Sequence, residues 1–110
     1  MTAGIYDMKI EQGATLNLTL TFKDSDGAVI DKSSYTFAAM IREDYDSPKI
    51  IDLTIDETNK ASGIIVLSLT ATQTAALNFN TGVWDLESTT GSTIAREIQG
   101  KVELSKEVTK

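Results

Sequence analysis

The sequence predicts an all-β fold, a β-sandwich of about seven to eight short strands with one helical turn. Apolar and polar residues alternate with a period of two in several segments, as expected for strands with one buried face. Turn-forming residues separate these segments at intervals of roughly 8–12 residues. No long helical pattern lies between them, which argues against a parallel α/β sheet. The chain of 110 residues fits a single domain spanning residues 1–110, with short arms at both ends.

The first part of the chain contains the clearest strand signal. Met1–Asp7 is expected to be an extended arm, and a short strand is expected at Tyr6–Ile10. In Ala14–Phe22, leucine and phenylalanine alternate with threonine and asparagine, which predicts a half-buried strand. Asp24-Ser25-Asp26-Gly27 follows as a turn, because aspartate can bond nearby backbone and glycine supplies a positive φ.

Three further strands are expected in the middle of the chain. Tyr35–Ile41 presents an apolar face on alternate residues, and the single proline lies in the charged loop that follows it. Ile50–Ile55 is expected to be one strand whose alternate apolar residues, Ile51, Leu53 and Ile55, point inward. Ile64–Thr70 buries its odd-numbered residues but also carries apolar residues on the opposite face.

The last third contains the expected helix and two more strands. Thr70-Ala71-Thr72-Gln73 has the spacing of a capping box and predicts a helical turn at Ala71–Leu77. In Val83–Ser88, Trp84 alternates with acidic residues, so we expect its ring in the core. The final strand is expected at Thr93–Leu104 with a bulge or bend at Gly100, and a polar tail follows at Ser105–Lys110.

Composition narrows the possible functions. The formal net charge of −6 disfavours nucleic-acid partners, because phosphates are also negative. The sequence contains neither histidine nor cysteine, which removes thiol nucleophiles, thiolate zinc sites and the usual general base. We therefore expect no enzymatic activity, no cofactor, no metal and no small-molecule substrate. No signal peptide or stretch of about 20 apolar residues is visible, so we expect no membrane partner and synthesis in a cytoplasm.

The remaining motifs that could hold a ligand have simpler structural interpretations. Asp24-x-Asp26-Gly27 resembles the start of a calcium loop, but Tyr35 stands where the loop would need a glutamate. Asn17-Leu18-Thr19 matches a glycosylation sequon within an expected strand. Carboxylates gather at residues 43–46 and 52–57, and we interpret them as solvated charges on an acidic surface.

Two strands are apolar on both faces, which is unusual for an isolated sandwich. The additional apolar residues give four candidates for a protein interface: Ala38, Met40, Ile64 and Val66. One explanation is that these residues contact a neighbouring subunit. The alternative is that the helical turn or a terminal arm of the same chain covers them.

The order of features resembles a known class of domains. Ile10-Glu11-Gln12-Gly13 leads into the Leu16–Phe22 alternation, and Gly82-Val83-Trp84-Asp85-Leu86-Glu87 precedes the final strand Ile98–Leu104. This arrangement is similar to the small Ig-like virion structural domains of tailed bacteriophages, including the N-terminal domain of upper baseplate proteins. The resemblance implies an Ig-like antiparallel sandwich. Gly82-x-Trp84 stands where many such sandwiches carry Gly-x-Tyr, so a tyrosine-corner bond is not expected.

The resemblance also implies a function and partners. The chain is expected to be a non-catalytic virion protein that docks onto other virion proteins of the tail, baseplate or neck in a multi-copy assembly. A capsid decoration protein is the alternative within this class. A carbohydrate-binding module for host glycans is the alternative from another class, and it would need exposed aromatic rings, for which Tyr6, Tyr45 and Phe79 are the candidates.

Overall fold

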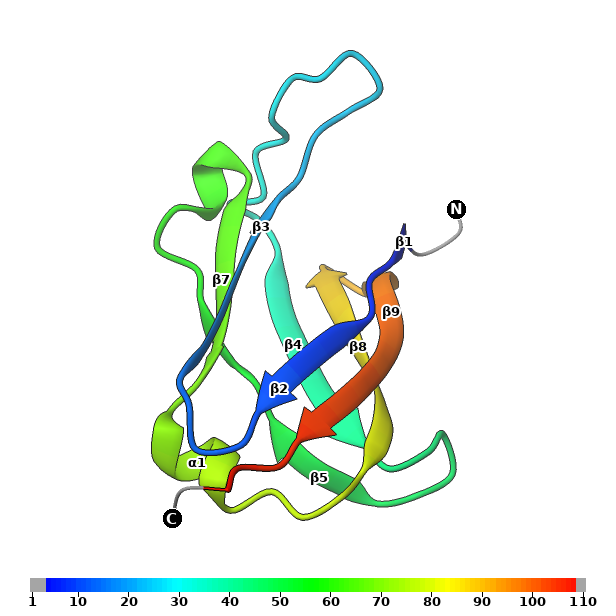
Figure 1. The fold of residues 1–110 in the computed structure, drawn as a ribbon. Coiled ribbons are helices and arrows are strands. Elements are labelled where there is room, and N and C mark those ends of the chain that lie inside the picture. Colours follow the sequence, from blue (N-terminus) through cyan, green and yellow to red (C-terminus); the bar gives the residue numbers. More distant parts are fainter. Residues whose placement is uncertain (1–3, 109–110) are drawn as a thin grey trace.

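The computed structural model describes residues 4–108, which form two β-sheets packed face to face (Figure 1). The larger sheet has the strand order β1-β9-β8-β4-β5, with β2 also paired to β9, and the smaller has the order β3-β7-β6. The strands are β1 (Gly4–Ile5), β2 (Met8–Glu11), β3 (Leu16–Thr21), β4 (Thr36–Arg42), β5 (Lys49–Asp52), β6 (Thr54–Asp56), β7 (Ile64–Leu69), β8 (Thr81–Thr90) and β9 (Thr93–Ser105). The predicted β-sandwich is confirmed.

The core fills the space between the two sheets. Alternate residues of β7 and β8 point inward, so Leu67 and Leu86 have no exposed surface and Trp84 is also buried, as expected. The buried apolar residues are Met8, Ile10, Ala39, Ile41, Leu53, Ile65, Leu67, Leu69, Leu77, Phe79, Trp84, Leu86, Val102 and Leu104. Phe79 is therefore not the exposed aromatic that a glycan-binding surface would need.

One edge of the larger sheet departs from the expected antiparallel arrangement. Both β1 and β2 pair with β9 in parallel, with Gly4 opposite Ile98 and Met8 opposite Val102. Strand β2 leads through a short turn into β3 of the other sheet, so it must end where β3 begins. Strand β9 ends at the same end of the sandwich, and the two strands therefore run in the same direction (Figure 1).

The prediction of a single strand at Ile50–Ile55 is wrong. The chain pairs with β4 as β5, then crosses at Leu53 and pairs with β7 as β6 in the other sheet. The backbone N–H of Leu53 donates to the carbonyl of Ala39 at 2.9 Å, and its side chain lies in the core. Because both sheets face the same core, the inward alternation continues across the crossing.

Strand β9 has its irregularity at a different place from the one predicted. The pairing with β8 shifts between Leu86 and Glu87, so that Leu86 faces Ile98, Glu87 faces Arg96, and Glu97 has no partner in the ladder. On the basis of strict alternation, Ile94 would share the inward face of Ile98, Val102 and Leu104. The shift breaks this alternation, and Ile94 is exposed. Gly100 is needed for another reason, because a Cβ there would lie 2.0 Å from the backbone oxygen of Tyr6.

The predicted capping box is present at the start of helix α1 (Ala71–Ala75). The helix is two residues shorter than expected. Thr70 accepts from the backbone N–H of Gln73, and the Gln73 side chain accepts from the backbone of Thr70. The buried hydroxyl of Thr74 accepts from Gly13 N at 3.0 Å and donates to the carbonyl of Ala14 at 2.8 Å. Helix α1 thereby fixes the turn between β2 and β3.

The expected terminal arms are partly attached to the sandwich. From Gly4 onward the N-terminal segment pairs with β9, and the Asp7 carboxylate accepts from the backbone N–H of Lys101 at 2.9 Å. Near the other end, Glu107 N donates to the Gln12 side chain. Residues 1–3 and 109–110 of the expected arms lie outside the described residues. The part of the chain that the structure describes has no helix long and apolar enough to cross a membrane.

Candidate protein-interaction surfaces

The four candidate interface residues lie on two opposite faces of the sandwich. Ala39 and Ile41 of β4 are buried. Ala38 and Met40 alternate with them and therefore lie on the outer face of the larger sheet. Ile64 and Val66 alternate with the buried residues of β7 and lie, half-buried, on the outer face of the smaller sheet. The structure brings these candidates together in pairs and does not join them into one patch.

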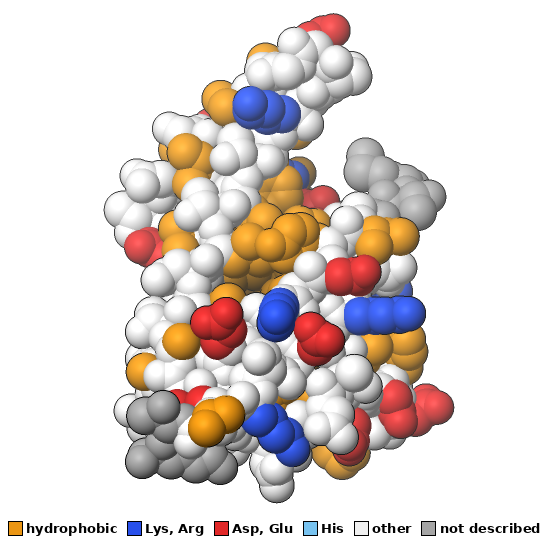
Figure 2. All heavy atoms as spheres, in the orientation of Figure 1, with side chains coloured by type: hydrophobic (Ala, Val, Ile, Leu, Met, Phe, Trp, Pro, Cys, Tyr) orange, Lys and Arg blue, Asp and Glu red, His pale blue; other side chains and the backbone are white. Residues whose placement is uncertain are grey.

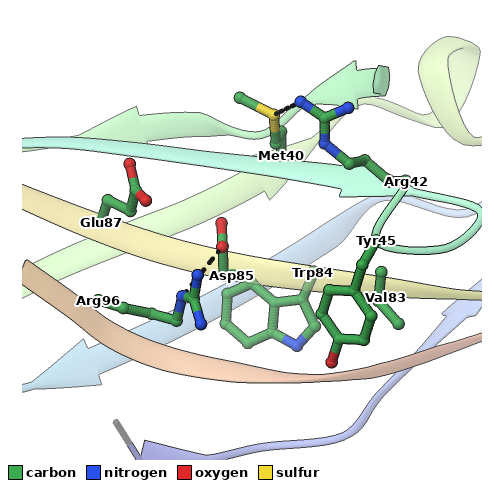
Figure 3. A pocket seen from close by; sticks show the side chains of 8 residues that line it. All are labelled: Met40, Arg42, Tyr45, Val83, Trp84, Asp85, Glu87 and Arg96. Atoms are coloured by element: carbon green, nitrogen blue, oxygen red, sulfur yellow. Dashed lines mark hydrogen bonds and ion pairs between the residues drawn. The ribbon is translucent and has the colours of Figure 1, made fainter. Parts of the chain in front are cut away.

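A shallow groove crosses the outer face of the larger sheet and includes Met40. It has a volume of about 370 Å³ and is lined by Met40, Arg42, Tyr45, Val83, Trp84, Asp85, Glu87 and Arg96. Figure 3 shows Tyr45 toward one end and the side chains of Glu87 and Arg96 toward the other. Tyr45 comes from the loop between β4 and β5 and is 70% exposed. The groove therefore has an accessible aromatic ring beside a polar floor.

The charges in this groove are largely balanced. Arg96 Nε lies 3.4 Å from Asp85 Oδ2, and Arg42 Nη2 lies 3.5 Å from the sulfur of Met40. Both members of the Arg96 pair are partly exposed, so the attraction between them is weak. The groove thus presents no strong field of one sign, and it is a poor match for a highly charged ligand.

Trp84 is unavailable as a platform for stacking sugars. Its ring is 2% exposed, and its indole N–H donates to the carbonyl of Tyr6 at 2.8 Å. Tyr6 meets the ring edge to face, with the ring centroids 6.4 Å apart. Of the aromatic residues considered for glycan binding, Tyr6 and Tyr45 are exposed and Phe79 is buried.

The outer face of the smaller sheet is different in character. Val66 lies between Thr19 of β3 and Asp56 of β6, and Ile64 lies opposite Thr21. The neighbouring positions Asn17 and Ser68 are also polar and uncharged. This face is therefore a threonine-rich surface with two isolated apolar side chains.

The acidic loops carry turn-forming carboxylates. Asp24 Oδ1 accepts from the backbone of Asp26 and Ala28 and closes a hairpin, as the turn interpretation predicts. Hydrogen bonds, chiefly from the side-chain hydroxyls of Ser47 and Thr58, hold the pKa values of Asp44 and Asp56 below their ordinary value. Groups held ionised in this way are unsuited to donate protons as general acids. Within residues 4–108 no group of three acidic, histidine or cysteine side chains could hold a metal ion.

One buried polar cluster has no counterpart among the residues that the sequence pattern singled out. Lys32 Nζ lies 3.2 Å from Glu97 Oε2, and the Ser88 hydroxyl donates to the same oxygen at 2.9 Å. The ammonium also lies over the rings of Tyr35 and Phe22, at 4.2 and 4.8 Å from their centroids. No local pattern could have revealed it, because Lys32 and Glu97 are 65 positions apart and Glu97 points inward only because of the bulge.

Comparison with known proteins supports the fold. No family model and no curated protein matches this sequence. The structure of CopC from Methylosinus trichosporium OB3b is similar with a TM-score of 0.52 and 10% identity, covering 93% of this chain and 88% of that one. The Lin-41 filamin domain matches with a TM-score of 0.48 and 12% identity, covering 87% and 81%.

The domain is an Ig-like β-sandwich. At such low identity the likeness to CopC shows the fold alone and says nothing about what this chain binds. Among small sandwiches of this kind, function depends on the surfaces.

Proposed function

We propose that this Ig-like domain is a non-catalytic structural protein of a tailed-phage virion that docks onto other virion proteins. The resemblance of the sequence to virion Ig-like domains supports the assignment to a phage particle. Within that class we favour the tail, baseplate or neck over capsid decoration. The protein would be made in the host cytoplasm and then become part of the particle in several copies.

The observation that carries the proposal is the groove on the outer face of the larger sheet. Met40 and Tyr45 supply apolar contact area, and Arg42 and Arg96 supply polar contacts around it. Methionine, tyrosine and arginine are the residue types enriched in protein interfaces. An accessible aromatic next to arginines on a rigid sheet therefore supports docking to a protein surface.

The glycan-binding alternative has less support. Sugar sites use exposed aromatic faces beside a groove, and here Tyr45 is the exposed aromatic among the groove residues because Trp84 is buried. Tyr6 makes a T-shaped contact with the buried Trp84 ring and is not among the residues that line the groove with Tyr45. A catalytic role would need a proton-transfer group, and two carboxylates of the acidic loops, Asp44 and Asp56, instead accept hydrogen bonds that close turns.

The test is a binding experiment with particles assembled without this protein. Phage carrying a nonsense mutation in the gene would be purified, mixed with the purified domain and sedimented. We expect the domain to sediment with the particles until its sites are saturated, and we expect Tyr45→Ala and Met40→Asp to reduce this binding. Val29→Asp, on the distant hairpin, changes another exposed apolar residue and should bind normally.

The opposite result would be equally clear. If the domain stayed in the supernatant and bound instead to sugars on a glycan array, the docking proposal would be wrong and the alternative function would replace it.

A further inference from the structure

Within the described part of the chain, strand β3 is an edge strand whose outward-directed backbone groups have no partner. Among residues 4–108 it pairs with β7 alone, at the end of the order β3-β7-β6. The backbone N–H of Phe22 donates to Gly63 of the segment leading into β7 at 2.7 Å, in register with the ladder. Backbone direction alternates along a strand, so Asn17, Thr19 and Thr21 direct their N–H and C=O groups away from β7.

This edge lacks the features that usually prevent strands from pairing. Proteins protect free edges with charges, prolines, bulges or short strand length. The other edges of the two sheets have such features: β5 follows Pro48 and carries Lys49, β2 carries Lys9 and Glu11, β1 has only two residues, and β6 has only three. Strand β3 has six residues, Leu-Asn-Leu-Thr-Leu-Thr, with no charge, proline or register shift.

The core side of the same strand is incompletely covered. Leu16, Leu18 and Leu20 are half-buried, whereas their inward-facing partners on β7 are almost completely buried. Figure 2 shows hydrophobic side chains gathered in a hollow beside β3. At the start of the strand, Leu16 and Asn17 line a groove of about 270 Å³ together with Lys9 and Glu11 of β2. An added strand would both use the free backbone groups and cover the leucines.

The chemistry of the edge favours a second copy of this chain as the added strand. Two molecules with a net charge of −6 repel one another, so their contact is favoured where no charge is present. In an antiparallel pair centred on Thr19, the strand is its own complement: Thr19 faces Thr19 of the second copy, and Asn17 faces its Thr21. These are the residues with free backbone groups, so every facing pair exchanges both hydrogen bonds. Cross-strand threonine pairs are also favourable.

We propose that two copies of this protein associate through β3 in a two-fold antiparallel pair centred on Thr19, which joins their smaller sheets into one continuous sheet. A two-fold contact of this kind is self-limiting and gives a closed dimer. This dimer would be one contact of the multi-copy assembly in the proposed function. It can be tested on the purified protein alone.

The test uses charge reversal at the centre of the pair. We expect wild-type protein to dimerise with increasing concentration in sedimentation-velocity experiments. Thr19→Lys and Thr19→Asp each place like charges opposite one another, and each should weaken the dimer by at least about tenfold. An equimolar mixture of the two variants should restore dimers as heterodimers. Thr54→Lys changes an exposed threonine on the same outer face but on β6, and it should dimerise as wild type does.

Three results would overturn this inference. The first is a wild-type protein that remains monomeric at every concentration. The second is a dimer that persists unchanged in Thr19→Lys. The third is a mixture of the two variants that fails to form dimers. Circular dichroism would establish that the variants are folded, since the Thr19 side chain is exposed. Failure of particle binding with dimerisation intact would contradict the proposed function and leave the dimer standing.

Discussion

The carbonyl of Tyr6 accepts a 2.8 Å hydrogen bond from the indole N–H of Trp84, a residue 78 positions later in the chain. This bond satisfies the polar atom of a buried ring. The same carbonyl lies directly over Gly100, where there is no space for a side chain. Tyr6 therefore holds the N-terminal segment against the larger sheet through two elements, β8 and β9.

Gly100→Ala should release this segment. The new Cβ would lie 2.0 Å from the Tyr6 oxygen, so the backbone must move and the Trp84 bond must be lost. We expect the free energy of unfolding in urea to fall by about 2 kcal/mol, as for other overpacked sites. Hydrogen exchange at residues 4–7 should become faster. Gly4→Ala is the control, because its Cβ would be 3.7 Å from the nearest atom and should cost much less.

Lys32→Met should destabilise the domain through the charge that it leaves behind. Lys32 and Glu97 side chains are 9% and 16% exposed, so loss of the ammonium leaves a largely buried carboxylate with only Ser88 as a partner. We expect a loss of about 2 kcal/mol, less than for a fully buried pair. Adding Glu97→Met should recover much of it. Lys49→Met, which breaks the exposed pair with Asp52, should change stability by less than about 0.5 kcal/mol.

Thr70→Ala should weaken the junction between β7 and α1. The substitution removes the acceptor for Gln73 N, and N-cap losses of this type cost about 1 kcal/mol. Thr70→Ser keeps the oxygen and should retain most of the stability. Thr72→Ala, within the helix and without a capping role, should be neutral or slightly stabilising. Equal urea midpoints for the Thr70→Ala and Thr72→Ala variants would show that the capping box contributes nothing.

The turn at Asp56 gives a pH dependence with a defined sign. The Thr58 hydroxyl and then its backbone N–H lower the folded-state pKa of Asp56 below 3.8. Because the pKa of Asp56 is lower in the folded state, its ionised carboxylate stabilises the fold at pH values above the pKa of the unfolded state. This stabilisation is lost as the pH falls through the pKa of the folded state. Thr58→Val should therefore raise the Asp56 pKa measured by NMR and make unfolding less dependent on pH below about 4. Thr54→Val, without a bond to Asp56, should leave that pKa unchanged.

Local patterns predicted most of the strands and the helix. The alternation in residues 14–22 and the spacing of Thr70 and Gln73 depend on near neighbours, so both could be interpreted without tertiary information. The crossing at Leu53 could not be predicted, because the alternation of Ile51, Leu53 and Ile55 is the same whether the residues belong to one sheet or to two sheets sharing a core.

The surfaces were less predictable than the strands. Sequence parity places Ala38, Met40, Ile64 and Val66 away from the core, but it does not say which sheet each belongs to. The edge position of β3 could not be predicted from the sequence, because it depends on the order in which the strands pair. The groove beside Met40 could not be predicted either, because Arg96 lies on the outer face only as a result of the bulge at Glu97.

The proposed role of this domain as a building block of a virus particle can be tested by quantitative mass spectrometry. The measurement compares purified phage particles with the soluble fraction of the infected host cells. We expect the protein to be retained in the particles in several copies, in a fixed ratio to known structural proteins. If the protein were absent from the particles and abundant in the soluble fraction, it would not be a structural component of the virion.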